Sequence, residues 1–296
     1  MARFLCGFVP RKVHQLYKQY RVVKYLKRYL PKVSNYEKCI VKENPYPDKI
    51  WTMWLQGYNS APEIVKACID SIKKYSNGRE VIVLDENNVF DYAKMPQHIV
   101  EKYNKGLITK THFSDLVRLE LLDSYGGTWI DSTMYCTDNF EVFLKPDLMF
   151  FQKLRTDNVY IMSSFFMHST NQHNYIIYRL KECLYDYWQK NNKLLEYFLL
   201  HFFFVVLVEN DERGYKEWKE MPMFMSWLPQ ILVQEYTKEF NQERFDYIKQ
   251  LCPVHKFSYK KDGFYSGIKL EEEYIAENSL YHMLVKPYQE GKQCQK

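Results

Sequence analysis

The sequence predicts an α/β protein with a Rossmann-like, mainly parallel sheet flanked by helices. Residues 50–56 (IWTMWLQ) are an apolar run typical of a buried strand, residues 63–75 have apolar positions at helical spacing, and residues 80–84 (EVIVL) are a second apolar run. Strand, helix and strand in this order indicate a βαβ unit. The 296 residues, 46% of them hydrophobic, suffice for one large α/β domain with an appended arm and exclude global disorder.

Ligands of such sheets bind beyond the carboxyl ends of the strands. Here those ends are residues 56–58, which begin with Gln56 and Gly57, and residues 85–87, which begin with Asp85. No GxGxxG follows the first strand and no GxxxxGK occurs. The predicted nucleotide-binding mode is therefore neither the dinucleotide mode nor the P-loop mode.

A helix is predicted over residues 111–125, and Gly126-Gly127 then ends it. The next apolar run, residues 128–135 (TWIDSTMY), reads as a strand that carries Asp131 in its interior. The glycine turn would bring this strand back beside the helix. An aspartate inside a buried strand must be hydrogen-bonded or metal-bound.

Asp115 and Arg118 lie three residues apart on the predicted helix and share a face. With Asp131 nearby, two carboxylates and one guanidinium would meet at one cleft. This set suits a nucleotide-sugar, because carboxylates hold sugar hydroxyls while an arginine or a hard divalent cation offsets the diphosphate. Alternatively, Asp115 and Arg118 form a surface ion pair worth about 0.3 kcal/mol.

The motif S-D-x-x-R at Ser114–Arg118, followed by Y-G-G-x-W-x-D at Tyr125–Asp131, resembles the core of glycosyltransferase family 32 and of bacterial capsular polysaccharide synthesis proteins. It also resembles a segment of the large clostridial glucosylating toxins. The likeness extends more weakly over residues 49–138 and near the C-terminus. It implies a GT-A fold, a nucleotide-sugar donor, a divalent metal (Mn2+ or Mg2+) and transfer with retention of anomeric configuration.

The resemblance also implies residue roles. Asp115 and Arg118 would hold the donor sugar, and Asp131 would be the first residue of the DXD motif. Trp54, Gln56 and Gly57 match the strand end that meets the nucleoside, with Trp54 stacked on the base. Asp85, at the end of the second strand, is a further candidate for binding the nucleotide-sugar.

The sequence departs from the family at the DXD motif, which here is Asp131-Ser132-Thr133. The hydroxyl of Thr133 is a poorer ligand for a hard cation than a carboxylate. Asp131 would then bind metal alone, or Asp138 would contribute, or the metal would be weak or dispensable. His282 is the best-placed candidate for a C-terminal metal-binding histidine.

Another C-terminal candidate is His255, followed by Lys256, which we expect to meet the diphosphate. No carboxylate is singled out by the sequence as a nucleophile. Double displacement and front-face displacement both remain open.

Nine Lys or Arg and no acidic residue occur in residues 1–33, which leaves 32 basic against 36 acidic residues in the remainder. We predict a basic amphipathic helical arm over residues 1–45 and a GT-A domain over 46–296, with a helix-rich acceptor-side region at about 150–250. The arm has apolar residues at helical spacing and would lie on an anionic membrane surface; alternatively it is a solvated or core-packed helix. Those apolar residues are Val13, Leu16, Tyr20, Val23 and Leu30.

The seven cysteines are odd in number and lack a CxxC pair, which argues against a disulfide framework and a structural zinc site. The N-terminus shows no secretory signal. The longest apolar run, residues 197–208, is shorter than the about 20 residues that span a bilayer, and predicts a buried helix with His201 as a satisfied core histidine. These features predict a cytoplasmic protein, peripheral on the inner face of the plasma membrane.

The preferred prediction is a hexosyltransferase that moves sugar from a nucleotide-sugar, with UDP-sugar favoured, to a growing, lipid-linked capsular or surface polysaccharide. One alternative is a toxin-like transferase that glycosylates protein, although the chain lacks the large extra domains of those toxins. Another is a non-catalytic GT-A domain. Nucleic-acid binding through the basic arm is disfavoured, because the remainder is acidic and carries no known nucleic-acid motif.

Overall fold

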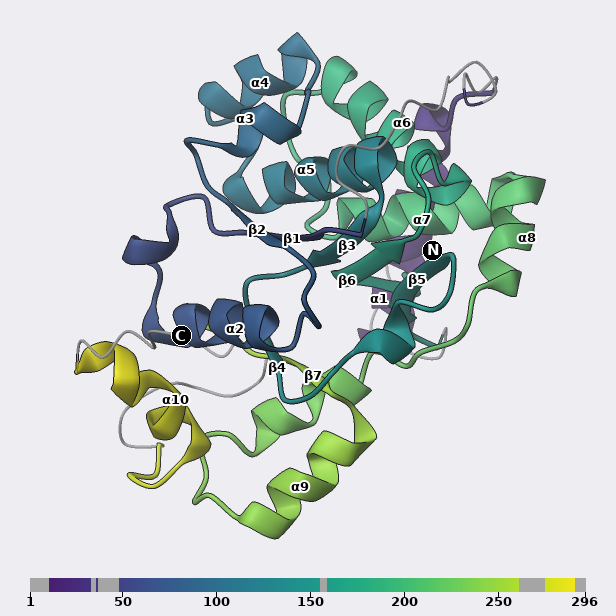
Figure 1. The fold of residues 1–296 in the computed structure, drawn as a ribbon. Helices are drawn as coiled ribbons and strands as arrows, with labels where there is room; N and C mark the ends of the chain where they lie inside the picture. Colours follow the sequence, from purple (N-terminus) through teal and green to yellow (C-terminus); the bar gives the residue numbers. More distant parts are fainter. Residues whose placement is uncertain (1–10, 33–35, 37–47, 155–158, 261–274, 291–296) are drawn as a thin grey trace.

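The computed structural model describes residues 11–32, 36, 48–154, 159–260 and 275–290 (Figure 1). Its central feature is a five-stranded sheet of order β2-β1-β3-β6-β5, and a two-stranded sheet pairs β4 with β7. The strands are β1 Ile50–Met53, β2 Val81–Leu84, β3 Gly127–Ile130, β4 Met134–Cys136, β5 Leu148–Gln152, β6 Met162–Ser169 and β7 Val254–Lys256.

The strand directions confirm the predicted α/β class. Strand β1 pairs in parallel with both β2 and β3, so that Ile50 faces Val81 on one side and Thr128 on the other. Strand β6 is antiparallel to β3, and β5 is antiparallel to β6. Four of the five strands therefore run in the same direction, and β6 alone is reversed within this sheet.

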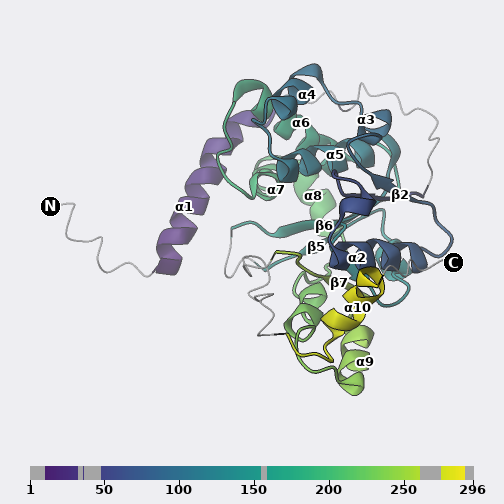
Figure 2. The ribbon, with the colours of Figure 1, turned by 90° about the vertical axis from the view of Figure 1, so that its left-hand side faces the viewer.

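Helices cover both faces of the sheet. Figures 1 and 2 show α3 to α6 on one side and α2, α9 and α10 on the other. The helices are α1 Arg11–Leu26, α2 Glu63–Lys74, α3 Val89–Tyr92, α4 Gln97–Asn104, α5 Lys110–Tyr125, α6 Tyr175–Lys190, α7 Leu199–Asn210, α8 Glu212–Glu220, α9 Gln242–Leu251 and α10 Leu280–Gln289.

Alternation along the strands divides the core between these faces. Trp51 and Trp129 belong to the largest hydrophobic cluster, with the buried residues of α5, α6 and α7. Their neighbours Ile50 and Ile130 belong to a second cluster, which includes Ile72 of α2. Both faces are therefore apolar, which explains why the strands read as continuous apolar runs in the sequence.

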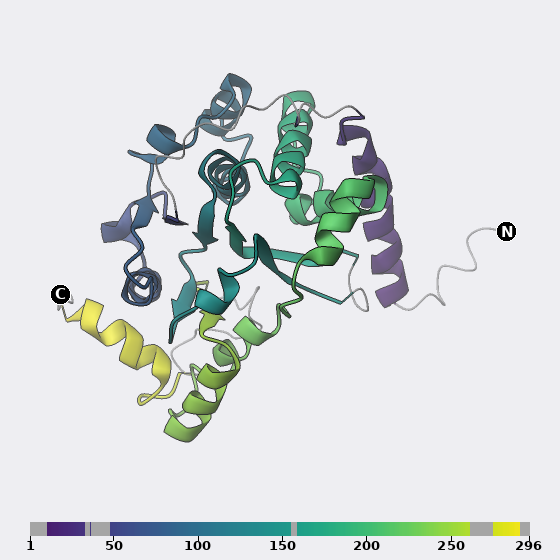
Figure 3. The same ribbon diagram turned by 45° about the vertical axis from the view of Figure 1, so that its right-hand side comes forward.

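Helix α1 packs against α7 at the edge of the molecule, where Figures 2 and 3 show it in purple. Val23, Leu26 and Tyr29 are buried in the largest core cluster. The ring of Tyr29 meets that of Phe203 edge-on at 6.3 Å. The middle of the predicted arm, at residues 23–29, is thus anchored to the core.

The apolar side predicted for the arm is divided between core and solvent. Leu16 packs against the core cluster, as does Val23. Val13, Tyr17 and Tyr20 are instead 51%, 62% and 52% exposed. The core-packed alternative therefore accounts for one side of this helix and leaves a basic, aromatic side in solvent.

The apolar run at residues 197–208 forms the buried helix α7, as predicted. Within the described ranges, no helix is both long and apolar enough to cross a bilayer. Cys68, Cys136, Cys183 and Cys252 are buried free thiols, and the other three cysteines lie outside the described residues.

Candidate active site

The site begins with helix α5, which is buried over most of its length. Thr109 caps its N-terminus by accepting a hydrogen bond from the backbone N–H of His112. Side chains around the helix are buried because α5 lies between the sheet and α6. Asp115 and Arg118 are therefore carried on a helix whose position is determined by packing on both sides.

The turn after α5 requires glycine. Gly126 and Gly127 have φ values of 66° and 83°, in the region that favours glycine. A Cβ on Gly127 would collide with the carbonyl oxygen of Lys49, and one on Gly126 would lie 2.9 Å from that of Ser169. Because the glycines allow this close approach, β3 fits between β1 and β6. The residue that follows β3, Asp131, then lies beside Arg118.

The predicted strand over residues 128–135 is wrong in one respect that matters for the site. Strand β3 ends at Ile130, and the chain turns, with the N–H of Met134 donating to the carbonyl of Asp131 at 2.8 Å. Strand β4 then joins a different sheet, because it pairs with β7. Asp131 therefore lies at the carboxyl end of a parallel strand, where α/β sheets bind ligands.

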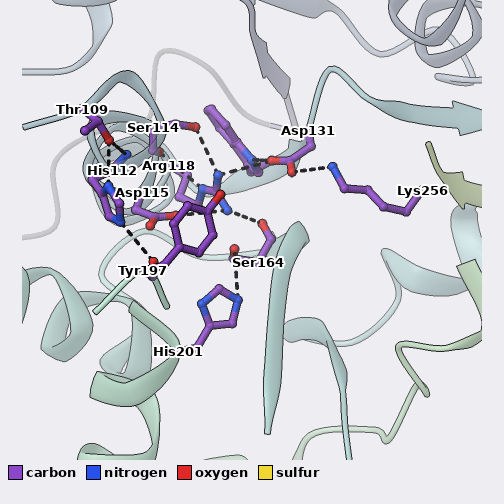
Figure 4. Close-up of polar contacts among 11 residues, drawn as sticks. Thr109, His112, Ser114, Asp115, Arg118, Asp131, Ser164, Tyr197, His201 and Lys256 are labelled. Atoms are coloured by element: carbon purple, nitrogen blue, oxygen red, sulfur yellow. Dashed lines mark hydrogen bonds and ion pairs between the residues drawn. The ribbon is translucent and has the colours of Figure 1, made fainter. Parts of the chain in front are cut away.

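Arg118 joins the two carboxylates (Figure 4). Its Nη1 lies 3.4 Å from Asp115 Oδ1, and its Nη2 lies 3.3 Å from Asp131 Oδ1. Nη1 also donates to the carbonyl of Ser164 at 2.6 Å. The Arg118 and Asp115 side chains are only 6% and 12% exposed, so this pair is not the solvated surface pair that the sequence left open.

Lys256 completes the cluster from the far side. Its Nζ donates to Asp131 Oδ2 at 3.0 Å and to the hydroxyl of Thr133. Trp129 Nε1 donates to the other carboxylate oxygen, Asp131 Oδ1, at 2.9 Å. Asp131 thus lies between two cations, and both of its oxygens are engaged.

The two carboxylates differ in their pKa values. Burial raises the pKa of Asp115 and outweighs the opposing effect of Arg118. Burial would also raise the pKa of Asp131, but the charges of Lys256 and Arg118, with the hydrogen bonds that it accepts, hold that pKa below its usual value. Asp131 is therefore the more firmly ionised of the pair.

Two histidines lie beside the cluster (Figure 4). His112 Nε2 donates to the carbonyl of Tyr197 at 3.0 Å, while Nδ1 accepts from the Thr109 hydroxyl at 2.8 Å, and burial lowers the pKa of this ring. Burial lowers the pKa of His201 to about 3. His201 is a core histidine only half satisfied, since Nε2 lies 3.5 Å from Ser164 Oγ and Nδ1 lacks a partner.

The residues predicted to meet the nucleoside lie at the ends of β1 and β2. Strand β1 ends at Met53, so Trp54 and Gln56 follow it instead of lying within it as predicted. Trp54 packs edge-on against Tyr259, with ring centroids 5.1 Å apart, and Gln56 is exposed.

Gly57 and Asp85 are neighbours across these strand ends. Gly57 has a φ of 83°, and a Cβ there would lie 3.7 Å from Asp85 Oδ2. Asp85 Oδ1 accepts from the backbone N–H groups of Asn87 and Asn88. One oxygen of Asp85 therefore holds the turn after β2, while the other faces Gly57.

Comparison with known proteins identifies the family. The family described as "Capsular polysaccharide synthesis protein" matches residues 6–275. This chain belongs to that family. No curated protein matches it. Among solved structures it is similar to one described as "PaToxG Glycosyltransferase", with 14% identity over 71% of this chain and 85% of that chain and a TM-score of 0.39.

The assignment to glycosyltransferase family 32 and to the DXD type remains a prediction for this capsular polysaccharide synthesis protein. The PaToxG likeness is too distant to assign residue roles.

The residues predicted to bind a divalent metal do not fit one. Both carboxylate oxygens of Asp131 and the hydroxyl of Thr133 already face cationic or N–H donors. Throughout the described ranges, no three His, Cys, Asp or Glu side chains are grouped to hold a metal ion. A divalent cation between Asp131 and Thr133 would meet one carboxylate, one neutral hydroxyl and a competing ammonium.

The other predicted ligands are engaged in local contacts. His282 lies on α10, where its Nδ1 donates to the carbonyl of Ala276 at 2.9 Å. Asp138 is exposed two residues after the end of β4 and pairs with Lys249 at 3.8 Å. His255 is fully buried, with Nε2 3.0 Å from the Thr137 hydroxyl, and burial lowers its pKa to about 3.

Proposed function

We propose that this capsular polysaccharide synthesis protein is a glycosyltransferase that uses a nucleotide-sugar donor, with UDP-sugar favoured. The observation that supports the proposal is the cluster of Asp115, Arg118, Asp131 and Lys256 at the carboxyl end of the parallel strand β3. Its two cations suit a diphosphate, and its two carboxylates suit sugar hydroxyls.

The proposed reaction transfers the sugar from the nucleoside diphosphate to an acceptor hydroxyl. An acceptor hydroxyl oxygen forms a bond to the anomeric carbon, and the bond from that carbon to the β-phosphate oxygen breaks. The diphosphate leaves with the bonding electron pair, and the hydroxyl proton passes to a phosphate oxygen or to a base. Arg118 and Lys256 would offset the charge that develops on the diphosphate, while Asp115 and Asp131 would orient the sugar.

Retention of anomeric configuration is part of this proposal, on the basis of the resemblance to family 32. Double displacement requires a carboxylate below the anomeric carbon, whereas front-face displacement requires the departing phosphate to assist. The anomeric coupling constant of the product, measured by NMR, tests retention. Trapping a glycosyl-enzyme adduct would exclude front-face displacement as the sole route.

The acceptor that we propose is a lipid-linked, growing surface polysaccharide at the inner face of the plasma membrane. Support comes from α1, whose solvent side combines Val13, Tyr17 and Tyr20 with Lys18 and Arg21. Aromatic rings and cations on one side of a helix suit an anionic lipid surface. Helix α1 would then hold the domain at the membrane while its other side packs on α7.

Vesicle sedimentation tests this placement. We expect the full chain to sediment with vesicles of phosphatidylserine and phosphatidylcholine and not with phosphatidylcholine alone. The double change Lys18→Glu and Arg21→Glu should reduce binding at least about tenfold, since each cation contributes about 1 kcal/mol. The double change Lys216→Glu and Lys219→Glu on α8 is the matched control. Equal vesicle binding by the wild type and the α1 variant would remove α1 from the proposal.

Donor turnover tests the function itself. Purified protein would be incubated with single UDP-sugars and GDP-sugars, with and without oligosaccharide acceptors, and nucleoside diphosphate release followed. We expect one donor to be used. Asp131→Asn should lower turnover by about 10²- to 10³-fold, whereas Asp138→Asn, an exposed acid beyond β4, should not.

The contrary outcome is specific. If no nucleotide-sugar or nucleoside diphosphate binds in calorimetry, the proposed function is wrong and the non-catalytic alternative holds. Equal loss of turnover in Asp131→Asn and Asp138→Asn would remove the cluster from the argument.

A further inference from the structure

The ammonium of Lys256 lies at the place where the predicted DXD motif would hold a metal. It bonds Asp131 Oδ2 at 3.0 Å and also the hydroxyl of Thr133, the first and last residues of the DXD segment. The DXD segment therefore already binds a cation, which is the ammonium of Lys256. Asp131 Oδ1 faces a second one, the guanidinium of Arg118, at 3.3 Å.

Backbone pairing holds Lys256 in this place. Strands β4 and β7 pair antiparallel, with Lys256 opposite Met134. The next residue, Phe257, donates its N–H to the carbonyl of Thr133 at 2.9 Å, and its ring stacks on Tyr135. A lysine on a buried two-stranded ladder, flanked by the fully buried His255, is not a mobile surface cation.

Lys256 nevertheless remains accessible to a ligand. Its side chain is 27% exposed, and that of Asp131 is 23% exposed. An ammonium has three N–H donors, and two of them point to Asp131 and Thr133. The third can meet a phosphate oxygen without breaking either contact.

We propose that Lys256 takes the place of the divalent cation, so that its ammonium binds the donor diphosphate without metal. The inference rests on the proposed function and explains the departure at Thr133. A hydroxyl in place of the second carboxylate suits a singly charged ammonium, which needs one anion and one neutral acceptor. Asp131, whose other oxygen faces Arg118, would position the Lys256 ammonium for this contact.

Nucleoside diphosphate binding without turnover tests this inference. UDP and GDP would each be titrated into the full chain by calorimetry, once in EDTA and once in Mn2+. We expect the binding nucleotide to have the same affinity in both. Lys256→Ala should weaken it by about 10- to 100-fold, the equivalent of one hydrogen bond to a charged group. Lys249→Ala, which removes a partly exposed lysine of α9, is the matched control.

A second variant restores the motif. In the double change Thr133→Asp and Lys256→Ala, the segment would regain two carboxylates and lose the competing ammonium. We expect this protein to bind one Mn2+ in the presence of UDP or GDP, measured by electron paramagnetic resonance, and to bind nucleotide more weakly in EDTA. The wild type should bind no stoichiometric Mn2+. Unchanged circular dichroism would show that each variant folds.

The outcomes separate this inference from the proposed function. Wild-type binding that is lost in EDTA, restored by Mn2+ and unaffected by Lys256→Ala would overturn the role of Lys256 and leave a metal-dependent transferase. Absence of UDP and GDP binding in both conditions would overturn the proposed function, and the inference with it. Affinity that is independent of EDTA and dependent on Lys256 supports both.

Discussion

Helix α5 contributes to two charge clusters, and the two differ in how far solvent reaches them. The site cluster, toward the N-terminal end, is Asp115, Arg118, Asp131 and Lys256. The helix cluster, toward the C-terminal end, is Glu120, Asp123 and Lys181. Each combines carboxylates with a lysine from a distant part of the chain.

The helix cluster is closed. Lys181 Nζ lies 3.2 Å from Glu120 Oε2 and also contacts Asp123, whose side chain is 1% exposed. The Tyr185 hydroxyl donates to Glu120 at 2.7 Å, and His173 Nδ1 lies 3.1 Å from Asp123. Burial would lower the pKa of Lys181, but the two carboxylates outweigh burial and raise it.

The comparison shows what distinguishes a structural ion pair from a binding site on the same helix. In the helix cluster, partners from α6 surround the carboxylates and tie α5 to α6. In the site cluster, Asp131 and Lys256 retain about a quarter of their side-chain exposure. Both clusters are charged, but only the site cluster is open to a ligand.

The largest expected effect on stability comes from breaking the helix cluster. Lys181→Met should lower the free energy of unfolding by about 3–5 kcal/mol, because it leaves two buried carboxylates without a cation. Urea denaturation measures this change. Lys190→Met, also on α6, removes a largely exposed partner of Asp186 and should cost less than about 1 kcal/mol. Similar losses in both would mean that the helix cluster is not buried in solution.

Asp131→Asn tests the site cluster, where we expect a large loss of turnover and a small loss of stability. Arg118 keeps Asp115 as a partner, and Lys256 is partly exposed, so the loss of stability should be well below that of Lys181→Met. Turnover should fall by about 10²- to 10³-fold. Paired measurements of urea midpoint and donor turnover test this. A stability loss that matches Lys181→Met would assign Asp131 a structural role.

Asp115→Asn gives the smallest effect, and it depends on pH. Because the pKa of Asp115 is raised in the folded state, the folded protein binds its proton more tightly than the unfolded chain does. The contribution of Asp115 to the free energy of unfolding therefore falls as the pH rises from about 4, the pKa of an aspartate in the unfolded chain, toward neutrality.

The Asn variant should consequently be more stable than the wild type at pH 7 and equal to it below about pH 4. Nucleotide-sugar affinity should fall about tenfold at pH 7, as expected for one hydrogen bond from a sugar hydroxyl to a charged group. Denaturation at several pH values, with calorimetry at pH 7, measures both. A less stable variant at neutral pH would show that Arg118 needs this carboxylate for folding.

The sequence predicts those parts of the molecule that depend on neighbours along the chain. The βαβ unit, the glycine turn after α5 and the meeting of Asp115, Arg118 and Asp131 all lie within short segments. The break at Ile130 was missed because residues 128–135 are apolar enough for one strand. Only the pairing of β4 with β7 shows that the run serves two sheets.

Contacts between distant segments were beyond prediction. Lys256 was expected near the diphosphate, but not as the partner of Asp131, 125 residues earlier. Glu120, Asp123 and Lys181 drew no expectation, because nothing local separates them from a solvated helix face. Likewise, no pattern in the sequence joins Tyr259 to Trp54.

The late position of Lys256 in the chain has a consequence for synthesis on the ribosome. All five strands of the main sheet lie within residues 50–169, so this sheet can assemble while residues 254–256 are still to be translated. The ladder between β4 and β7 closes afterwards, as a long-range and therefore slow contact. A nascent chain would thus hold Asp115 and Asp131 in place before Lys256, its second cation, has been translated.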